Sequence, residues 1–420
     1  MANSINFTSY NNITDISIPN DVIHNGNFSN KFRGMRSLLN CSIPNNLTDI
    51  SWICYGCYNL VNMTPLCTDN IVNMSAAYGE CRYVVGTFAC GNNVVDMSSA
   101  YLRCNNITGS PVCGPNVVYF NSAYHSCRNL TGHPVCGNKV VDMSSAYARC
   151  NNITGSPVCG PNVVRMDGAY DDCSKLTGNP VCTDKITDMA NTYNNCVNLT
   201  GHPVCGNNVT TMFNAYANCV NITGSPVCGP NVECMNNAYI NCYNITGSPV
   251  CGNNVINMYS TYANCYNLTG SPVCGPNVVN MCAAYRYCNN ITGEPVFGPK
   301  ANNISSAYSG CTSLNFTGNI VILDVVRYMN YVFSECPNVQ GNVYIYSNIV
   351  NGASNCFKGR DNSNMLNIYA YNNTSGNTIN SLIVTGRESI VGTDVRWTND
   401  TANKRYYNTA HNIYIYYTLT

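Results

Sequence analysis

The stretch NNITGSPVCGPNVV occurs twice without a change, at Asn105–Val118 and Asn151–Val164. The two copies lie 46 residues apart and a diverged copy lies midway between them, so the underlying period is 23 residues. Self-similarity at a short fixed period is typical of repeat architectures, whose units bury their apolar faces against one another. The sequence therefore predicts one elongated solenoid instead of several globular domains.

A first column of cysteines marks the units. From Cys81 to Cys311 it advances by 23 residues at each step, and a tyrosine usually stands three residues before the cysteine. A second column, which includes Cys113, usually follows nine residues after the first. In late units Ile322 and Ile345 replace it, so we expect it to face inward, because cysteine packs as a small hydrophobe. The expected core cysteines are Cys104, Cys113, Cys127, Cys136, Cys150 and Cys159.

Two segments carry a resemblance to a known family. VVDMSSAYARC (Val140–Cys150) and SIPNNLTDISWICYGCYNL (Ser42–Leu60) resemble the leucine-rich repeats of BspA-like surface proteins, whose units combine an Ala-Phe-x-x-Cys step with a strand. In this chain Tyr usually replaces the Phe, and Pro-Val-Cys stands where the family often has Ile-x-Ile. The resemblance covers about Ser17 to Cys356. It implies a mainly β, leucine-rich-repeat-like right-handed stack with one short parallel strand per unit, and a role in adhesion or binding.

Charged residues are sparse and balanced. The chain has 20 Lys and Arg against 20 Asp and Glu, and charged residues make up 10% of it. This composition predicts neither nucleic-acid binding nor attraction to acidic membranes. No stretch reaches the roughly 20 apolar residues of a membrane span. The first twenty residues lack the basic start and apolar run of a secretory signal, which predicts folding in a cytoplasm.

The cysteines admit sharper interpretations. A disulfide framework is typical of short secreted chains, and neighbouring units about 4.8 Å apart exceed the Cβ spacing of about 3.5–4.5 Å in a disulfide. We therefore expect mostly free thiols. Only Cys54 and Cys57 have the spacing of a structural zinc pair, and Cys54 stands where other units carry Tyr, so both are expected in the core. No metal and no cofactor is predicted.

Asn-x-Thr recurs in most units. A secretory pathway would read it as a glycosylation signal. Without a signal segment, we expect the Asn to cap a turn, the following Ile or Leu to enter the core, and the Thr to begin a strand. The positions are Asn106, Asn129, Asn152, Asn198, Asn221, Asn244, Asn267 and Asn290.

Enzyme chemistry finds little support in the sequence. The five histidines have no recurring carboxylate or nucleophile partner, and no phosphate-binding or dinucleotide fingerprint occurs. No catalytic residue is predicted.

One polar position varies while its neighbours stay fixed, and we name it the outer column. The strand alternation places it on the outer face, beside a Thr column and a Val column expected to form an exposed ridge. Such a column predicts either a solvated surface or a flat binding surface. Its residues are Ser110, His133, Ser156, Asn179, His202, Ser225, Ser248, Ser271 and Glu294.

Four segments are expected along the chain. Residues 1–31 form an N-terminal arm or cap, 32–317 the regular solenoid, 318–377 degenerate repeats, and 378–420 a C-terminal β cap or attachment segment. Caps are needed because each end of a solenoid exposes an open sheet edge.

These observations favour a non-enzymatic structural or host-contact protein of a bacteriophage virion: a fibre, decoration or tail-associated protein assembled in the host cytoplasm. The alternative is an extracellular adhesin on the surface of a bacterium or microbial eukaryote, as the resemblance implies. A cytoplasmic scaffold is a third class. The expected partners are other virion or surface proteins, with a host receptor, a glycan or a second copy of the chain as further candidates.

Overall fold

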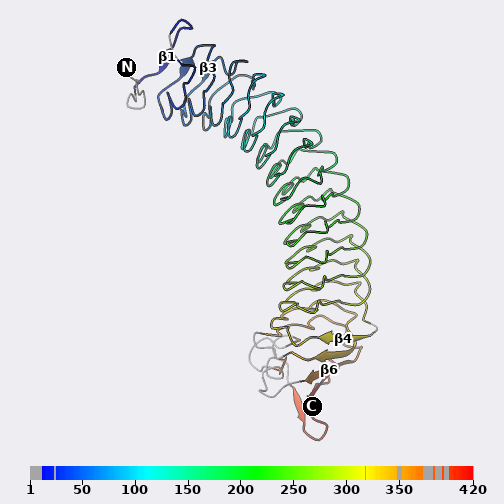
Figure 1. Cartoon of the computed structure of the whole chain (residues 1–420). Coiled ribbons are helices and arrows are strands. Elements are labelled where there is room, and N and C mark those ends of the chain that lie inside the picture. Colours follow the sequence, from blue (N-terminus) through cyan, green and yellow to red (C-terminus); the bar gives the residue numbers. More distant parts are fainter. Residues whose placement is uncertain are drawn as a thin grey trace. The chain divides into compact units, whose positions relative to one another are not determined.

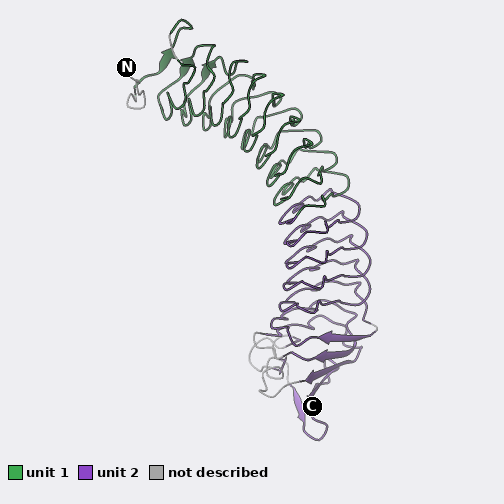
Figure 2. Cartoon of the chain, viewed as in Figure 1, with its two compact units in different colours: residues 1–209 green, residues 210–420 purple. Residues whose placement is uncertain are grey.

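The computed structural model describes residues 12–22, 25–316, 318–347, 352–371, 382–383, 390–391 and 397–419. The chain is a mainly β solenoid of about 14 turns, called rungs below, with almost no helix in these ranges (Figure 1). It divides into two compact units, Met1–Val209 and Thr210–Thr420 (Figure 2).

Unit 1 begins with a three-stranded parallel sheet. Its strands are β1 (Asp15–Ser17), β2 (Asn40–Ser42) and β3 (Asn62–Thr64), hydrogen-bonded in that order. Ile16 lies opposite Cys41, which lies opposite Met63, so the first rungs are in register. The part of the predicted N-terminal arm that the structure describes therefore includes a strand paired with β2.

Unit 2 ends with a six-stranded sheet in the order β4-β5-β6-β9-β8-β7. Parallel pairing joins β4 through β6 to β9, and antiparallel pairing joins β9 to β8 and β8 to β7. The first three strands coincide with the expected degenerate repeats, and β9 adds a strand to them. The strands are β4 (Asn319–Ile322), β5 (Gly341–Ile345), β6 (Leu366–Tyr371), β7 (Thr398–Asp400), β8 (Arg405–Asn408) and β9 (Ile413–Leu419). The predicted segment boundaries stay predictions, and residues 372–381 lie outside the described ranges.

Between these two sheets the rungs differ from the expectation of one short strand per unit. Neighbouring rungs are joined by isolated parallel bridges, and most of these bridges fall just before the Met of each unit, as at Asp96 and Asp142 in unit 1. The segment Ser110–Cys113, where a strand was expected, is extended but forms no strand.

A tyrosine explains why that strand is missing. The hydroxyl of Tyr124 donates to the Val112 carbonyl at 2.6 Å and accepts the Val112 N–H at 3.0 Å. Pro111 has no N–H to offer a neighbouring rung. The two backbone groups that would form a ladder at Val112 are therefore satisfied from inside the rung. We call this arrangement the tyrosine clamp.

The clamp recurs in nearly every regular rung. Tyr147 holds Val135 in unit 1, and Tyr262 holds Val250 in unit 2, each with an O–H···O distance of 2.6 Å. The clamp rings are fully buried and stack on one another, with a centroid separation of 5.7 Å and an interplanar angle of 4° between Tyr101 and Tyr124. Each clamp therefore packs the core and ties the outer segment to it.

Strands return where the clamp loses its hydroxyl. Phe333 and Phe357 continue the aromatic stack at a centroid separation of 5.9 Å. The clamped-valine position is occupied here by Val321 of β4 and Tyr344 of β5, which lie opposite each other in parallel strands. Because phenylalanine has no hydroxyl, the N–H and C=O groups at this position form hydrogen bonds with the neighbouring strand instead.

The segment that leads into the first cysteine links rungs in a second way. The N–H groups of Met97, Ser99, Tyr101 and Arg103 donate to carbonyls of the next rung, at 2.8–2.9 Å. The alternate N–H groups close short turns within the rung, as from Cys104 to the Tyr101 carbonyl. These turns place Ser99 and Arg103 at φ values of 56° and 58°, in the left-handed region.

Within unit 2, the buried Arg360 links the hairpin that contains β9 to the segment around Asn364. The guanidinium of Arg360 donates to the carbonyls of Asn364 at 2.7 Å and His411 at 2.8 Å, and to three others. Burial lowers the pKa of Arg360 to about 10. The hairpin that contains β9 is thus anchored by a cation that binds only backbone oxygens.

The clamp predicts the effect of Tyr147→Phe. The substitution leaves the Val135 N–H and carbonyl without their partner, so we expect a loss of about 1–3 kcal/mol for each group left unsatisfied. Urea unfolding measures the loss, and amide exchange at Val135 locates it.

The matched control is Tyr119→Phe, because the Tyr119 side chain is 50% exposed. If the Tyr147 variant were as stable as this control, the clamp would be a packing contact alone.

Candidate functional site

The outer column lies on the surface, as expected. All nine of its residues are exposed. Each is followed by a proline and then by the valine of the Val column. Within a unit they recur at every rung, so their side chains form a row along the solenoid axis.

A glycine of the next rung lies against most of the outer-column side chains. A Cβ built on Gly155 would overlap the imidazole of His133, and one built on Gly178 would overlap the Ser156 hydroxyl. Gly155 and Gly178 have φ values of 81° and 82°, which an L side chain rarely adopts. The glycine therefore leaves room for the variable side chain of the preceding rung to lie flat against its backbone.

A threonine fixes the glycine in place. The Thr154 N–H donates to the Gly132 carbonyl at 2.8 Å, and the Thr154 hydroxyl donates to the same oxygen at 3.2 Å. In unit 2, Thr269 makes the same pair of bonds to Gly247. The outer column is thus held between an exposed Thr column and the clamped Val column.

The Val column is less exposed than the predicted ridge. Val112, Val135 and Val158 are half-buried, and Val296 reaches 40% exposure. The clamp draws the Val backbone toward the core, so the side chains do not project freely. The face presented beside the outer column is mixed and not apolar.

The second cysteine column lies less deep than expected. Cys113, Cys136 and Cys159 are half-buried, whereas Ile322 and Ile345 at the same position are fully buried. The reason is the neighbouring glycine: the Gly160 N–H donates to the Cys136 Sγ at 3.2 Å, and glycine has no side chain to cover the sulfur. These cysteines line the corner between core and surface.

The first cysteine column is in the core. Cys104, Cys127 and Cys150 are fully buried. The Cys127 thiol donates to the Tyr101 carbonyl at 2.9 Å, and the Cys150 thiol donates to the Tyr124 carbonyl at 3.0 Å. Each thiol therefore satisfies the backbone of a clamp tyrosine in the preceding rung, a role that its spacing did not reveal.

Two other hypotheses about the cysteines concern a zinc pair at Cys54 and Cys57 and a disulfide framework. Cys54 and Cys57 are fully buried, and the Cys57 thiol donates to the Phe32 carbonyl. None of the cysteines in the described ranges is joined in a disulfide. Burial raises the pKa of Cys136 to about 11 and that of Cys113 to about 12, and it raises the pKa of Cys150 further.

The Asn-x-Thr segments meet the expectation in part: the Ile or Leu is buried, but Thr154 and Thr200 begin no strand. Asn152 and Asn198 donate through their side-chain amides to backbone carbonyls of the preceding rung at 2.8 Å. The following Ile153 and Leu199 are fully buried. Asn therefore holds one rung to the next at this corner.

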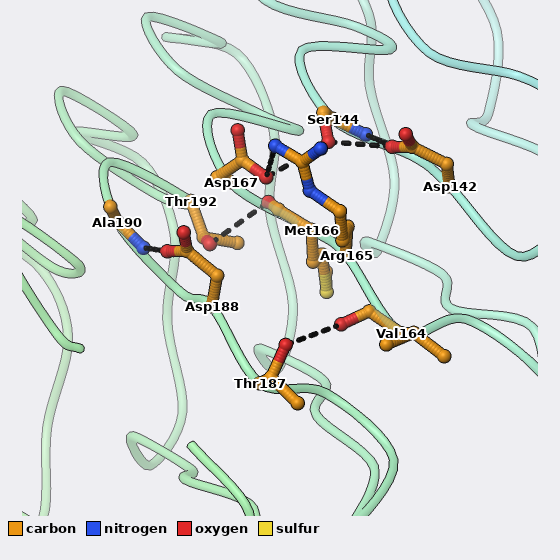
Figure 3. A network of polar contacts seen from close by, with 10 residues as sticks. All are labelled: Asp142, Ser144, Val164, Arg165, Met166, Asp167, Thr187, Asp188, Ala190 and Thr192. Carbon is orange, nitrogen blue, oxygen red and sulfur yellow. Dashed lines mark hydrogen bonds and ion pairs between the residues drawn. The ribbon is translucent and has the colours of Figure 1, made fainter. Parts of the chain in front are cut away.

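A charged network at another corner was not expected. Asp142 caps the Ser144 N–H at 2.8 Å, and the Ser144 hydroxyl contacts Asp167 at 2.8 Å. Arg165 pairs with Asp167 at 3.3 Å (Figure 3). Asp188 caps the Ala190 N–H in the next rung. The Asp-x-Ser spacing signals the Asp142 cap, but only the register of the rungs brings Ser144 next to Asp167.

Other site chemistry can be stated for the described ranges only. There, no group of three or more His, Cys, Asp or Glu residues could hold a metal ion. No helix in that part of the chain is long and apolar enough to cross a membrane. His125 is half-buried, and burial, followed by nearby Arg149 and Arg103, lowers its pKa.

Comparisons with known proteins give distant structural likenesses. No family model matches the sequence, and no curated protein matches it. A leucine-rich repeat protein from Bacteroides ovatus is similar at 15% identity over 85% of this chain and 87% of its own, with a TM-score of 0.42. A leucine rich cell surface protein from Faecalibacterium prausnitzii is similar at 15% identity over 90% of this chain and 91% of its own, with a TM-score of 0.33.

The raised thiol pKa values predict slow labelling of the native protein. At pH 8 only a small fraction of each column is thiolate, the reactive form, so a disulfide reagent should modify few of the 28 cysteines. Labelling of the second column should accelerate as the pH approaches 11, because these thiols are half-buried and ionise there.

Denaturant provides the control, since all cysteines should then react. Rapid labelling of most cysteines in the native state at pH 8 would contradict the placement of both columns.

Proposed function

We propose that this chain is a non-enzymatic adhesion protein that contacts a protein or glycan partner through the outer column. The observation that carries the proposal is the fit between most variable side chains, His133 among them, and the glycine of the next rung. A polar side chain held in one place loses little conformational entropy when it binds. The frame around it stays constant while its identity changes between Ser, His, Asn and Glu.

The chemistry of this face suits a partner rich in hydrogen-bonding groups. In unit 2 the outer-column position continues as Asn319, Asn342 and Asn367, whose amides bond to one another at 3.2 Å. Beside them the rings of Tyr344 and Tyr369 stack at 5.0 Å and are half-buried. Amides, hydroxyls and phenols recognise sugars or polar protein surfaces without needing charge.

A cell surface is the setting that we propose for this role. Adhesion requires an exposed and ordered face, which the outer column supplies. The test below also distinguishes this setting from a virion role, in which the partners would be capsid or tail proteins.

The test is a double substitution in unit 1. We expect His133→Ala with His202→Ala to weaken binding by about tenfold, since truncating a central contact residue costs about 1 kcal/mol or more. The labelled full chain would be screened on a glycan array and on immobilised matrix proteins, and the strongest binder used for titration.

The matched control is Lys139→Ala with Lys185→Ala, two exposed residues of unit 1 outside the outer column. Equal affinity of the histidine variant and the control would remove the outer column from the binding site. Failure to bind any glycan or matrix protein, together with co-purification with virus particles, would replace adhesion with the virion role.

A further inference from the structure

One corner of unit 1 gathers positive charge on a chain that is neutral overall. The corner comprises the residues on either side of the first cysteine column. Successive rungs are hydrogen-bonded here, as from the Glu80 N–H to the Leu102 carbonyl at 2.7 Å and from the Arg103 N–H to the His125 carbonyl at 2.8 Å. We call the exposed guanidinium groups at this corner the arginine corner: Arg33, Arg36, Arg82, Arg103, Arg128 and Arg149.

These arginines repeat every second rung. Arg36, Arg82 and Arg128 each follow the first-column position directly, and 46 residues separate each from the next. Arg103 and Arg149 form a second row with the same separation, just before the first cysteine. The distance along the axis is that of two rungs, or about 9.6 Å if each rung adds about 4.8 Å.

Aromatic rings hold several of these guanidinium groups. The Tyr58 ring lies between Arg36, whose Cζ is 5.5 Å from the ring centroid, and Arg82, at 5.2 Å. Arg33 lies 4.6 Å from the centroid of Trp52. Stacking uses the face of a guanidinium and not its N–H groups, so these groups can bind an anion. The ordering lowers the entropy lost on binding.

Carboxylates offset only part of this charge. Glu80 pairs with Arg82 at 3.2 Å and with Arg103 at 2.6 Å. Asp171 and Asp172 lie one rung beyond Arg149. The paired arginines remain about half exposed, at 52% and 50%. The corner therefore keeps a net positive charge.

We propose that the arginine corner binds an acidic polysaccharide that carries at least one anionic group per disaccharide. Guanidinium groups bind carboxylate and sulfate in a bidentate way, which suits uronic acids and sulfate esters. A sugar ring in an extended chain is similar in length to one rung, so a disaccharide matches the two-rung repeat of the arginines.

The same observations disfavour nucleic acid. A duplex carries one charge per about 1.7 Å of its axis, far denser than the spacing of these arginines. Single strands bind by stacking bases on a series of free aromatic faces. At this corner the faces of Tyr58 are covered by Arg36 and Arg82. Tyr83 is 54% exposed, but Asn59 and Asn106 occupy its position in the neighbouring rungs, so no aromatic series forms.

The experiment titrates the full chain with hyaluronan and with chondroitin sulfate at several salt concentrations. Arg36→Gln with Arg82→Gln and Arg128→Gln should bind about tenfold more weakly, from the loss of three exposed ionic contacts. The control, Lys139→Gln with Arg165→Gln and Lys185→Gln, removes the same charge from other corners of unit 1 and should bind like the unmodified chain. Affinity should fall as salt rises.

A second variant is needed because Arg36 and Arg82 pack on Tyr58, so that replacing them could weaken binding through a local loss of structure. Arg103→Gln with Arg149→Gln leaves those stacks intact and should also weaken binding. Binding that is unchanged in both arginine variants would overturn the proposal, as would no binding of either polysaccharide. Tighter binding of poly(dT) than of either polysaccharide, lost in the same variants, would assign the corner to nucleic acid instead.

Discussion

The hydroxyl of the clamp tyrosine is the interaction on which the regular rungs depend. One oxygen satisfies both backbone groups of a valine twelve residues away, and the ring beneath it fills the core. Because the hydroxyl replaces a ladder, the outer segment can contain a proline and a glycine that a regular strand would tolerate poorly. The first-column thiol completes the arrangement by binding the tyrosine's own carbonyl. The tyrosine, the valine and the cysteine are therefore joined by hydrogen bonds, and this accounts for their fixed spacing in the sequence.

The sequence predicted those features that can be found by comparing one repeat with the next. The period, the buried first cysteines, the buried Ile and Leu after each Asn, and the exposure of the outer column all follow from aligning one unit with the next. The clamp could not be predicted in this way, because it joins two positions across the interior of a rung. The depth of Cys136 was missed for a similar reason: it depends on a glycine of the adjacent rung having no side chain.

Charge shows the limit of composition most clearly. The totals of acidic and basic residues cancel, and this composition alone indicated no surface that attracts anionic partners such as nucleic acid or acidic membranes. Once the register is known, Arg36, Arg82 and Arg128 fall in one row while the acidic caps, such as Asp142, fall at another corner. A repeat of 23 residues sorts side chains by their position in the unit. A preference for arginine at one position of the repeat therefore produces a row of positive charges along the solenoid axis.

The glycine that faces each outer-column residue has a further consequence. Because it contributes no side chain, a change at one rung needs no compensating change at the next, and the column can be altered one position at a time. Duplicating a pair of units adds a new variable position without creating a new kind of interface. The surface of such a solenoid can therefore diversify, and its length can change, with little effect on the stability of the rungs already present.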